Sequence, residues 1–443
     1  MTTALTLALL VTFSQTTYEP TWESLDSRPN PQWFEDAKFG IFIHWGVYAV
    51  PAWGPKDRYS EWYWHDMMNK KGETWEFHKN TYGENFKYQD FAPMFKAEMY
   101  DPELWADIFK RSGAKYVVLT SKHHEGFSLW PDDTNWNWTA RDIGPHPDLL
   151  GDLTDAVRAA GLRMGYYYSL YEWFNPIYKN NVQRYVDEYM IPQLKGLVEK
   201  YKPDIVWPDG EWDYPDTTWR STEFLAWLFN ESSAPKDVAI NDRWGKGTRS
   251  IHGGFATPEY QHRSEGPLMA KGLFEECQGM GKSFGYNRNE TADNYRSTTK
   301  LLHLLIDTVS RGGNLLLDIG PTADGRIPEI MQQRLLEMGG WLDVNGEAIY
   351  GTTNWADAPE MDNVRFTLKN DTVYAICMEW PGAELMLPNV IKATGVKASM
   401  LGYEGFLKTV ANDQTVTIKI PCIPINEMPC DHAWVIKIGR AHV

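Results

Sequence analysis

Short apolar segments alternate with amphipathic ones between about residues 30 and 350. The apolar segments are rich in Val, Ile, Leu, Phe and Tyr and have the length of buried β-strands. The expected strands are Phe39–His44, Tyr116–Thr120, Met164–Ser169, Ile205–Trp207, Val238–Asn241 and Asn314–Asp318.

Helical periodicity fills the intervals between these strands. In the helix expected at Asp152–Ala160, Gly161 supplies a C-terminal cap, and the apolar residues Leu153, Ala156, Val157 and Ala160 share one face. Further helices are expected at Val182–Lys200, Thr222–Asn230 and Asp293–Ser310. The order of strand then helix predicts an α/β fold with a (β/α)8-like TIM barrel. A doubly wound sheet is the alternative, although no glycine-rich dinucleotide turn is present.

After about residue 355 the pattern changes to short runs in which apolar and polar residues alternate. Alternation of this kind is typical of strands with one buried face, and it predicts a smaller C-terminal β-sandwich. The runs are Val364–Leu368, Thr372–Ile376, Val416–Ile420 and Ala433–Ile438. We therefore expect a catalytic barrel over residues 15–354 and a sandwich over residues 355–443.

Residues 1–14 have the pattern of a signal peptide. An apolar stretch, Ala4–Val11, is followed by small residues at Thr12 and Ser14, although a basic start is missing. Four Asn-X-Ser/Thr sequons also favour secretion, because they are acceptors for N-glycans: Asn137, Asn230, Asn289 and Asn370. These features predict a secreted or lysosomal glycoprotein.

Composition narrows the range of partners. The 443 residues include 21 Trp and 23 Tyr, and the net charge is −16, which opposes binding to nucleic acid phosphates. No apolar run is long enough to predict a membrane span. The four cysteines form no CxxC motif, and Cys422 and Cys430 flank a proline-containing loop that could be closed by a disulfide.

The most informative segment is Asp204–Trp212, in which an apolar strand runs into two acids framed by tryptophans. In a (β/α) barrel the active site lies at the carboxyl ends of the strands. Asp209 is therefore a candidate nucleophile of a retaining glycosidase, with the indoles as sugar-packing faces. Two alternatives stay open: Asp209 is only a turn former in Pro-Asp-Gly, or it forms an acid–base pair with Glu211.

Other strand ends carry histidines, an arginine and aromatic residues. His44 follows the first strand, His123 and His124 follow the second, and Arg243 follows the fifth. The histidines suit hydrogen bonds to sugar hydroxyls; a metal site is the alternative, but adjacent histidines on a strand point opposite ways. Each could also be structural, and Arg243 could form an ordinary salt bridge.

Glu61 and Trp62 join a carboxylate to an aromatic wall in Ser60-Glu-Trp-Tyr-Trp64, or belong to an aromatic cluster over the barrel mouth. The general acid has two candidate settings. Glu259 lies in a loop after the fifth strand, and Glu275 and Glu276 lie beside Phe274. Burial in either setting would raise the pKa of the carboxyl and help it to keep its proton.

Seven motifs taken together resemble the α-L-fucosidases of glycoside hydrolase family 29. They are Trp33–Gly46, Ser60–Tyr63, Thr120–Phe127, Trp207–Trp212, Asn241–Gly245, Ser283–Arg288 and Gly312–Pro321. The resemblance implies a retaining exo-acting enzyme that removes terminal α-L-fucose from a fucosylated oligosaccharide or glycoprotein, with no metal and no cofactor. It leaves open which fucosyl linkage is preferred. It also leaves open the oligomeric state, including whether the protein forms a homo-oligomer.

The resemblance also implies roles for individual residues. Asp209 matches the nucleophile, and Glu259 matches one placement of the family's variable acid/base, with Glu275 as the rival. The remaining matches are to the fucose pocket: His44, Glu61, Trp62, His123, His124, Tyr167 (with Tyr168 as the alternative) and Arg243. Two other classes of function stay open, a metal-dependent barrel hydrolase and an inactive fucose-binding lectin.

Overall fold

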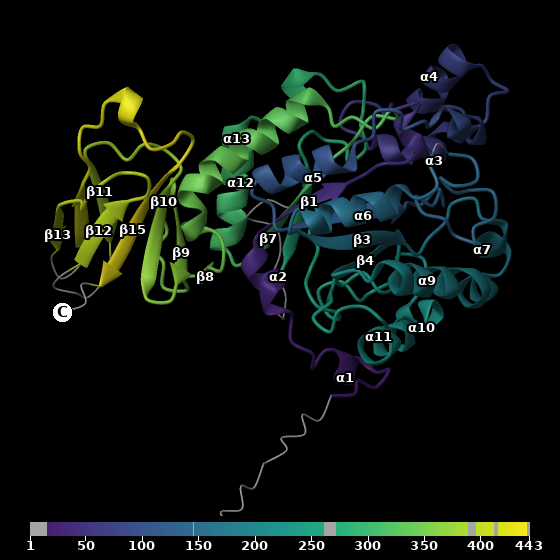
Figure 1. The fold of residues 1–443 in the computed structure, drawn as a ribbon, viewed down its shortest axis with the longest axis horizontal. Helices are drawn as coiled ribbons and strands as arrows, with labels where there is room; N and C mark the ends of the chain where they lie inside the picture. The colour runs from purple at the N-terminus through teal and green to yellow at the C-terminus, as the bar shows by residue number, and fades with distance from the viewer. Residues whose placement is uncertain (1–15, 145, 261–271, 389–395, 412–414, 441–443) are drawn as a thin grey trace, which may run out of the picture.

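The computed structural model describes residues 16–144, 146–260, 272–388, 396–411 and 415–440. A barrel of parallel strands occupies one end of the molecule and two antiparallel sheets the other, with α12 (Thr298–Ser310) and α13 (Glu329–Asn345) between them (Figure 1). The predicted signal peptide, residues 1–14, lies outside the described residues.

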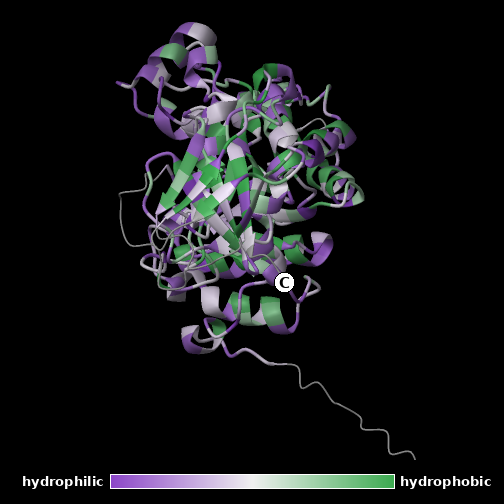
Figure 2. Ribbon diagram, turned by 90° about the vertical axis from the view of Figure 1, so that its left-hand side faces the viewer, coloured by the Kyte–Doolittle hydropathy of each residue, from purple (hydrophilic) through white to green (hydrophobic). Residues whose placement is uncertain are grey.

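Seven parallel strands form the barrel sheet in the order β5-β4-β3-β2-β1-β7-β6. Nearly all their residues are buried, and green segments recur along the central strands in Figure 2. Their bounds are β1 Phe39–Ile43, β2 Tyr116–Lys122, β3 Arg163–Ser169, β4 Ile205–Asp209, β5 Ala239–Ile240, β6 Glu275–Gly279 and β7 Asn314–Ile319.

An irregular stretch, residues 254–259, completes the ring between β5 and β6, and we call it the closing stretch. On one side the Phe255 amide donates to Ile240 O at 3.3 Å. On the other side the Glu275 amide donates to Ala256 O at 2.7 Å, and the Cys277 amide donates to Pro258 O at 3.0 Å. The closing stretch thus occupies the position of an eighth strand, and the predicted (β/α)8-like barrel is confirmed.

All six strands expected in the barrel are present, with ends shifted by up to two residues. The sequence missed β6, whose residues Glu-Glu-Cys-Gln-Gly have no apolar run. This strand tolerates acids because their side chains find hydrogen-bond donors inside the barrel, as shown for Glu275 below.

Helices cover the outside of the barrel and explain its burial. The helix expected at Asp152–Ala160 begins earlier, where Asp148 caps it by accepting from the Gly151 amide at 2.8 Å, and it ends before Gly161 at positive φ, as expected. The remaining bounds are α1 Trp22–Leu25, α2 Gln32–Ala37, α3 Tyr63–Met67, α4 Glu73–Tyr82, α5 Pro102–Arg111, α6 Leu149–Ala159, α7 Pro176–Asn180, α8 Val182–Tyr185, α9 Ile191–Tyr201, α10 Asp216–Trp219 and α11 Ser221–Asn230.

Two expected helices differ in detail from the structure. The helix predicted at Val182–Lys200 is interrupted by a π-helical turn at Val186–Met190, just before Pro192, which has no amide hydrogen to continue the regular ladder. The helix predicted from Asp293 starts at Thr298, where Ser297 provides the cap. The helix at Thr222–Asn230 is confirmed as α11.

The C-terminal part is built from two antiparallel sheets over one apolar core, as predicted. One sheet has the order β12-β15-β10-β9-β8 and the other β11-β14-β13. It is tied to the barrel helices through Trp341, whose indole N–H donates to Ala433 O at 2.8 Å. The bounds are β8 Thr353–Asn354, β9 Val364–Lys369, β10 Thr372–Cys377, β11 Glu384–Pro388, β12 Val396–Met400, β13 Thr409–Ala411, β14 Thr415–Lys419 and β15 Trp434–Arg440.

Cys422 and Cys430 do not form the disulfide that the sequence allowed; both are free thiols. Cys422 is exposed, whereas the Cys430 thiol is partly buried and contacts Ala433 O at 3.2 Å. Within the described ranges, no helix combines the length and apolar character required to cross a bilayer.

Adjacent glycines in α13 allow a matched test of helix packing. A Cβ at Gly339 would overlap the carbonyl oxygen of Arg111 at the end of α5, whereas a Cβ at Gly340 meets open space. We expect Gly339→Ala to lower the free energy of unfolding by about 1–3 kcal/mol, and Gly340→Ala to raise it by up to about 1 kcal/mol. Urea unfolding measures both, and equal effects of the two substitutions would contradict this packing.

Candidate active site

A small cavity of about 110 Å³ opens at the carboxyl ends of the barrel strands. Its wall brings together side chains from strand ends far apart in sequence, which is where (β/α) barrels place their chemistry. The lining residues are Phe42, His44, Tyr59, Glu61, Trp62, His123, His124, Tyr167, Trp207, Asp209, Trp212, Arg243, Glu259 and Phe284.

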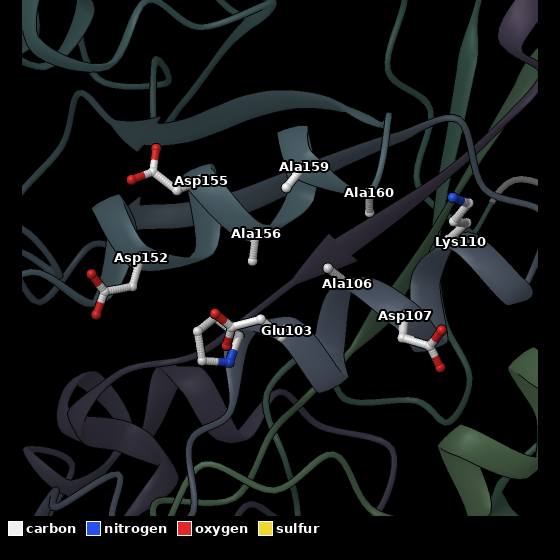
Figure 3. A pocket seen from close by; sticks show the side chains of 10 residues that line it. Glu103, Ala106, Asp107, Lys110, Asp152, Asp155, Ala156, Ala159 and Ala160 are labelled. Carbon is white, nitrogen blue, oxygen red and sulfur yellow. The ribbon is translucent and has the colours of Figure 1, made fainter.

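A larger cavity of about 630 Å³ lies outside the barrel, between α5 and α6. Figure 3 shows Ala106 of α5 across from alanines of α6, with carboxylates such as Asp107 and Asp152 at the edges. This groove lies within the outer helical layer, so the smaller cavity at the strand ends is the candidate active site.

Asp209 is the last residue of β4 and its carboxylate is held from both sides. Arg243 Nη1 donates to Oδ1 at 2.7 Å, and the Tyr167 hydroxyl donates to Oδ2 at 2.9 Å. Burial alone would raise the pKa of Asp209, but the charges of Arg243 and Arg249 outweigh it and lower the pKa. The cavity therefore contains a carboxylate that stays ionised and is fixed in position.

His124 faces this carboxylate as a neutral imidazole, because burial and the neighbouring His123 lower its pKa well below the usual value. The Ser169 hydroxyl donates to Tyr171 O at 2.5 Å, so its oxygen accepts from His124 Nδ1 at 2.6 Å. This arrangement leaves Nε2, 3.8 Å from Asp209 Oδ2, as a hydrogen-bond acceptor.

His44 and His123 complete a histidine wall. His44 Nδ1 shares a 2.6 Å hydrogen bond with Asp318 Oδ1, which leaves Nε2 free for a ligand. Burial and the neighbouring His123 lower the pKa of His44 well below its usual value. His123 stacks on Tyr167, with ring centroids 5.6 Å apart.

Glu61 enters the cavity from the short 3₁₀ helix Ser60–Trp62, and its Oε2 accepts from the Gly285 amide at 2.8 Å. Burial raises the pKa of Glu61 to about 7. Trp62 is half-buried and packs on Trp173 and His124, with centroids 5.0 and 5.6 Å away. Together they offer a polar group and an aromatic face to a ligand in the cavity.

Arg243 connects Asp209 to a second carboxyl. Its Nη2 donates to Glu259 Oε1 at 2.5 Å, and its Nε donates to Thr257 Oγ1 at 2.7 Å. The guanidinium also lies over the Trp207 ring, 4.4 Å from the centroid, and only 1% of its side chain is exposed. Both Glu259 and Thr257 belong to the closing stretch, so the irregular part of the barrel carries the second acid.

Of the ten residues singled out from the sequence, Glu275 alone does not line the cavity. It lies fully buried beneath it, where its oxygens accept from Tyr116 OH at 2.5 Å and from the indole N–H of Trp207 at 2.8 Å. Of the two tyrosines, Tyr167 lines the cavity, whereas the Tyr168 hydroxyl donates to Gln193 Oε1 at 2.5 Å on the helical side.

Glu211 is turned away from Asp209. Gly210 has φ of 74°, a left-handed conformation that ends the strand, and a Cβ there would overlap Tyr171. Glu211 instead accepts from Arg249 Nε at 2.5 Å and does not line the cavity. The structure thus does not support an Asp209–Glu211 acid–base pair.

Several residues of the site were not singled out from the sequence. Asp318 is the next-to-last residue of β7 and could have been found by reading the end of that strand, as was done for the others. Tyr59 directly precedes the Ser60–Tyr63 motif, and Phe284 lies inside another motif. Arg249, 3.6 Å from Asp209 Oδ1, lies in a loop and carries no sequence signal.

A carboxylate kept ionised, a second carboxyl beside it, hydrogen-bond acceptors for hydroxyls and aromatic faces are what glycosidic bond cleavage requires. Fold and site together define a glycoside hydrolase of the (β/α)-barrel type.

Comparison with known proteins identifies the family. The alpha-L-fucosidase family model matches residues 5–347, and the model of the alpha-L-fucosidase C-terminal domain matches residues 359–439. The chain is 44% identical to the tissue alpha-L-fucosidase of Rattus norvegicus, over 96% of this chain and 93% of that protein. It is 45% identical to the alpha-L-fucosidase of Branchiostoma floridae, over 98% of each.

Solved structures agree with this assignment. The structure of the Thermotoga maritima alpha-fucosidase in complex with a mechanism-based inhibitor aligns with a TM-score of 0.83 at 36% identity, over 95% of this chain and 99% of that one. The chain therefore belongs to the alpha-L-fucosidase family, glycoside hydrolase family 29, whose members are retaining fucosidases. The resemblance carried by the strand-end motifs is confirmed.

The buried Glu275 allows a test of the electrostatics. Burial raises the pKa of Glu275 to about 7 from 4.5, so the folded protein binds this proton more tightly than the unfolded chain. Its ionisation therefore costs stability as pH rises from 4.5 to 7. Between these pH values we expect wild type to lose on the order of 3 kcal/mol of unfolding free energy relative to Glu275→Gln. Denaturant unfolding at several pH values measures the difference in unfolding free energy between the two proteins. A difference that stays constant with pH would contradict the raised pKa of Glu275.

Proposed function

We propose that this protein removes terminal α-L-fucose from fucosylated oligosaccharides or glycoproteins by double displacement, with Asp209 as nucleophile and Glu259 as acid/base. The observation that carries these roles is the shared guanidinium of Arg243, which contacts Asp209 at 2.7 Å and Glu259 at 2.5 Å. Two carboxyls on neighbouring nitrogens of one group lie close together, as a retaining mechanism requires (about 5–5.5 Å).

In the first step Asp209 attacks the anomeric carbon while Glu259 gives a proton to the departing glycosidic oxygen. In the second step Glu259 takes a proton from water, which attacks the same carbon and releases fucose with Asp209 restored. Arg243 carries one positive charge between the two carboxyls. The group is therefore electrically neutral when Glu259 is protonated, and again when Asp209 is esterified and Glu259 is ionised.

Fucose recognition rests on polar and aromatic groups that face the cavity. His44 Nε2 and His124 Nε2 serve as acceptors for hydroxyls, because their Nδ1 atoms are engaged by Asp318 and Ser169. The neutral state of both rings suits this task, since a protonated imidazole offers no acceptor. Glu61 adds a further polar contact, and the face of Trp62 suits the apolar side of the sugar. The small size of the cavity suits the removal of a single terminal sugar.

The choice of Glu259 over Glu275 rests on access. Glu259 lines the cavity with 31% of its side chain exposed, whereas Glu275 is fully buried with both oxygens engaged. An acid/base must reach both the leaving oxygen and the incoming water, which favours the open position. We assign Glu275 a supporting role in orienting Trp207.

The location of the enzyme is part of the proposal: the protein is secreted or lysosomal. Animal relatives named tissue and plasma alpha-L-fucosidase favour this location. Of the four sequons, Asn137 and Asn370 are exposed, and we propose that these carry glycans. The side-chain amide of Asn230 bonds to the Tyr18 backbone and that of Asn289 donates to Gly54 O.

The rival functions make different predictions from this one. A fucose-binding lectin would bind fucose without turnover, and a metal-dependent hydrolase would lose activity to a chelator. Among the described residues, no group of three or more His, Cys, Asp or Glu side chains is arranged to hold a metal ion. Within the cavity, Arg243 and Tyr167 donate hydrogen bonds to Asp209, while His44 and His124 bond to Asp318 and Ser169.

Replacing Asp209 by Gly should lower hydrolysis of an aryl α-L-fucoside by roughly four orders of magnitude or more, because the nucleophile is lost. Azide fits the vacated space and should restore turnover, giving β-fucosyl azide with inverted configuration. Steady-state kinetics and NMR of the product measure both effects. Near-normal turnover by Asp209→Gly would overturn the assignment.

Replacing Glu259 by Ala should slow hydrolysis of fucosides with poor leaving groups by about 10²–10⁴-fold and spare those with very good ones. Azide should then react with the covalent intermediate and give α-fucosyl azide, the opposite anomer from the Asp209→Gly product. Glu275→Gln is the matched control and should show no such dependence on the leaving group. If the dependence appears in Glu275→Gln instead, the acid/base is Glu275.

A further inference from the structure

A second cavity of about 460 Å³ adjoins the active site. Tyr59 lines both cavities, and it packs 5.3 Å from Phe284, which lines the first. The second cavity is lined by Asp57, Arg58, Tyr59, Tyr260, Gln278, Lys282 and Arg296. A substrate that extends out of the active site past Tyr59 would therefore enter this space.

The position of Glu259 makes this the leaving-group side of the site, an argument that rests on the proposed acid/base role. An acid that protonates the departing oxygen must lie beside the sugar that leaves. Tyr260 follows Glu259 directly and lines the second cavity, with its ring 6.4 Å from Tyr59 and nearly parallel to it. The two rings form an aromatic border of the kind that packs against sugar rings.

The charge of this cavity is opposite to that of the whole protein. The chain has a net charge of −16, yet the lining has three cationic side chains, Arg58, Lys282 and Arg296, against one carboxylate, Asp57. Further carboxyls lie nearby: Glu259 is paired with Arg243, Glu290 accepts from the Lys282 amide at 2.7 Å, and Glu276 accepts from Gln278 Nε2 at 2.7 Å.

Two of the three cations have unused head groups. Arg58 and Lys282 are exposed, and neither makes a side-chain hydrogen bond or ion pair within the part of the chain that the structure describes. Arg296 is half-buried and donates to Gly279 O at 2.5 Å, which fixes it in the cavity wall. Gln278 is buried and gives its amide N–H to Glu276 at 2.7 Å, so its carbonyl oxygen can accept a hydrogen bond.

We propose that this second cavity is a leaving-group subsite that takes an acidic saccharide, one whose sugar next to fucose carries a sulfate ester or a carboxylate. Arg58, Lys282 and Arg296 bind the anionic group, and Tyr59 and Tyr260 contact the sugar ring. Cations within a Debye length of about 8 Å act on a bound anion, while the acidic surface farther away is screened. The subsite determines which glycans lose fucose, and the chemistry at Asp209 is unchanged.

The test compares fucosyl disaccharides that differ only in the anionic group. One pair is fucosyl N-acetylglucosamine with and without a 6-O-sulfate, and the other is fucosyl glucuronic acid against fucosyl glucose. We expect kcat/KM of wild type to be at least roughly fivefold higher for the acidic member at low ionic strength, and the ratio to fall with added salt. A preference in only one pair tells sulfate from carboxylate as the group recognised.

Variants locate the effect. Arg58→Gln and Lys282→Gln should each lower the ratio by roughly two- to fivefold, and the double variant should bring it close to one. Lys408→Gln, an exposed lysine of the C-terminal sandwich, is the matched control and should leave the ratio and the aryl fucosidase activity unchanged. The Arg58 and Lys282 side chains are both exposed, so their variants are expected to fold.

The outcomes separate this inference from the proposed function. Wild type that fails to hydrolyse any aryl α-L-fucoside refutes the proposed function itself. Wild type that hydrolyses the aryl fucoside but shows a ratio of one or less refutes the acidic subsite alone. A ratio above one that the double variant retains also refutes it, because the preference then comes from other residues.

Discussion

The buried guanidinium of Arg243 is the group on which the active site depends. Its side chain is 1% exposed and contacts Asp209 and Glu259. The two carboxyls and the face of the Trp207 ring stabilise the buried positive charge. Its third nitrogen is held by Thr257, whose hydroxyl donates to Asp242 at 2.7 Å. Removing this cation would leave two carboxyls facing each other in a buried site.

The titratable groups around Arg243 differ in their pKa values and therefore in their charge. Burial lowers the pKa of His44 and His124, which stay neutral, while the charge of Arg243 overcomes burial at Asp209 and lowers its pKa. Glu61 and Glu275, without such a cation in contact, have pKa values raised to about 7 by the same burial. The contact with Arg243 therefore keeps Asp209 ionised in a site where burial raises the pKa of other carboxyls.

Much of the fold could be read from local patterns, because barrel strands are buried on both faces, by helices outside and by packed side chains inside, and are therefore mostly apolar. The six expected barrel strands and four sandwich strands are all present. What local patterns missed is β6, since its acids satisfy their hydrogen bonds with Tyr116 and Trp207, residues distant in sequence. The closing stretch escaped notice for a similar reason: its backbone partners lie on both neighbouring strands.

The sequence by itself determined the family, the barrel, and the strand-end residues from His44 to Arg243, because a parallel barrel brings the carboxyl ends of its strands together. Only the tertiary structure shows that Glu259, Tyr167 and Asp209 line the cavity, whereas Glu275, Tyr168 and Glu211 do not. Each choice depends on the direction of a side chain, which a residue's place in the sequence leaves open. The second cavity with Arg58 and Lys282 likewise exists only where loops far apart in the chain meet.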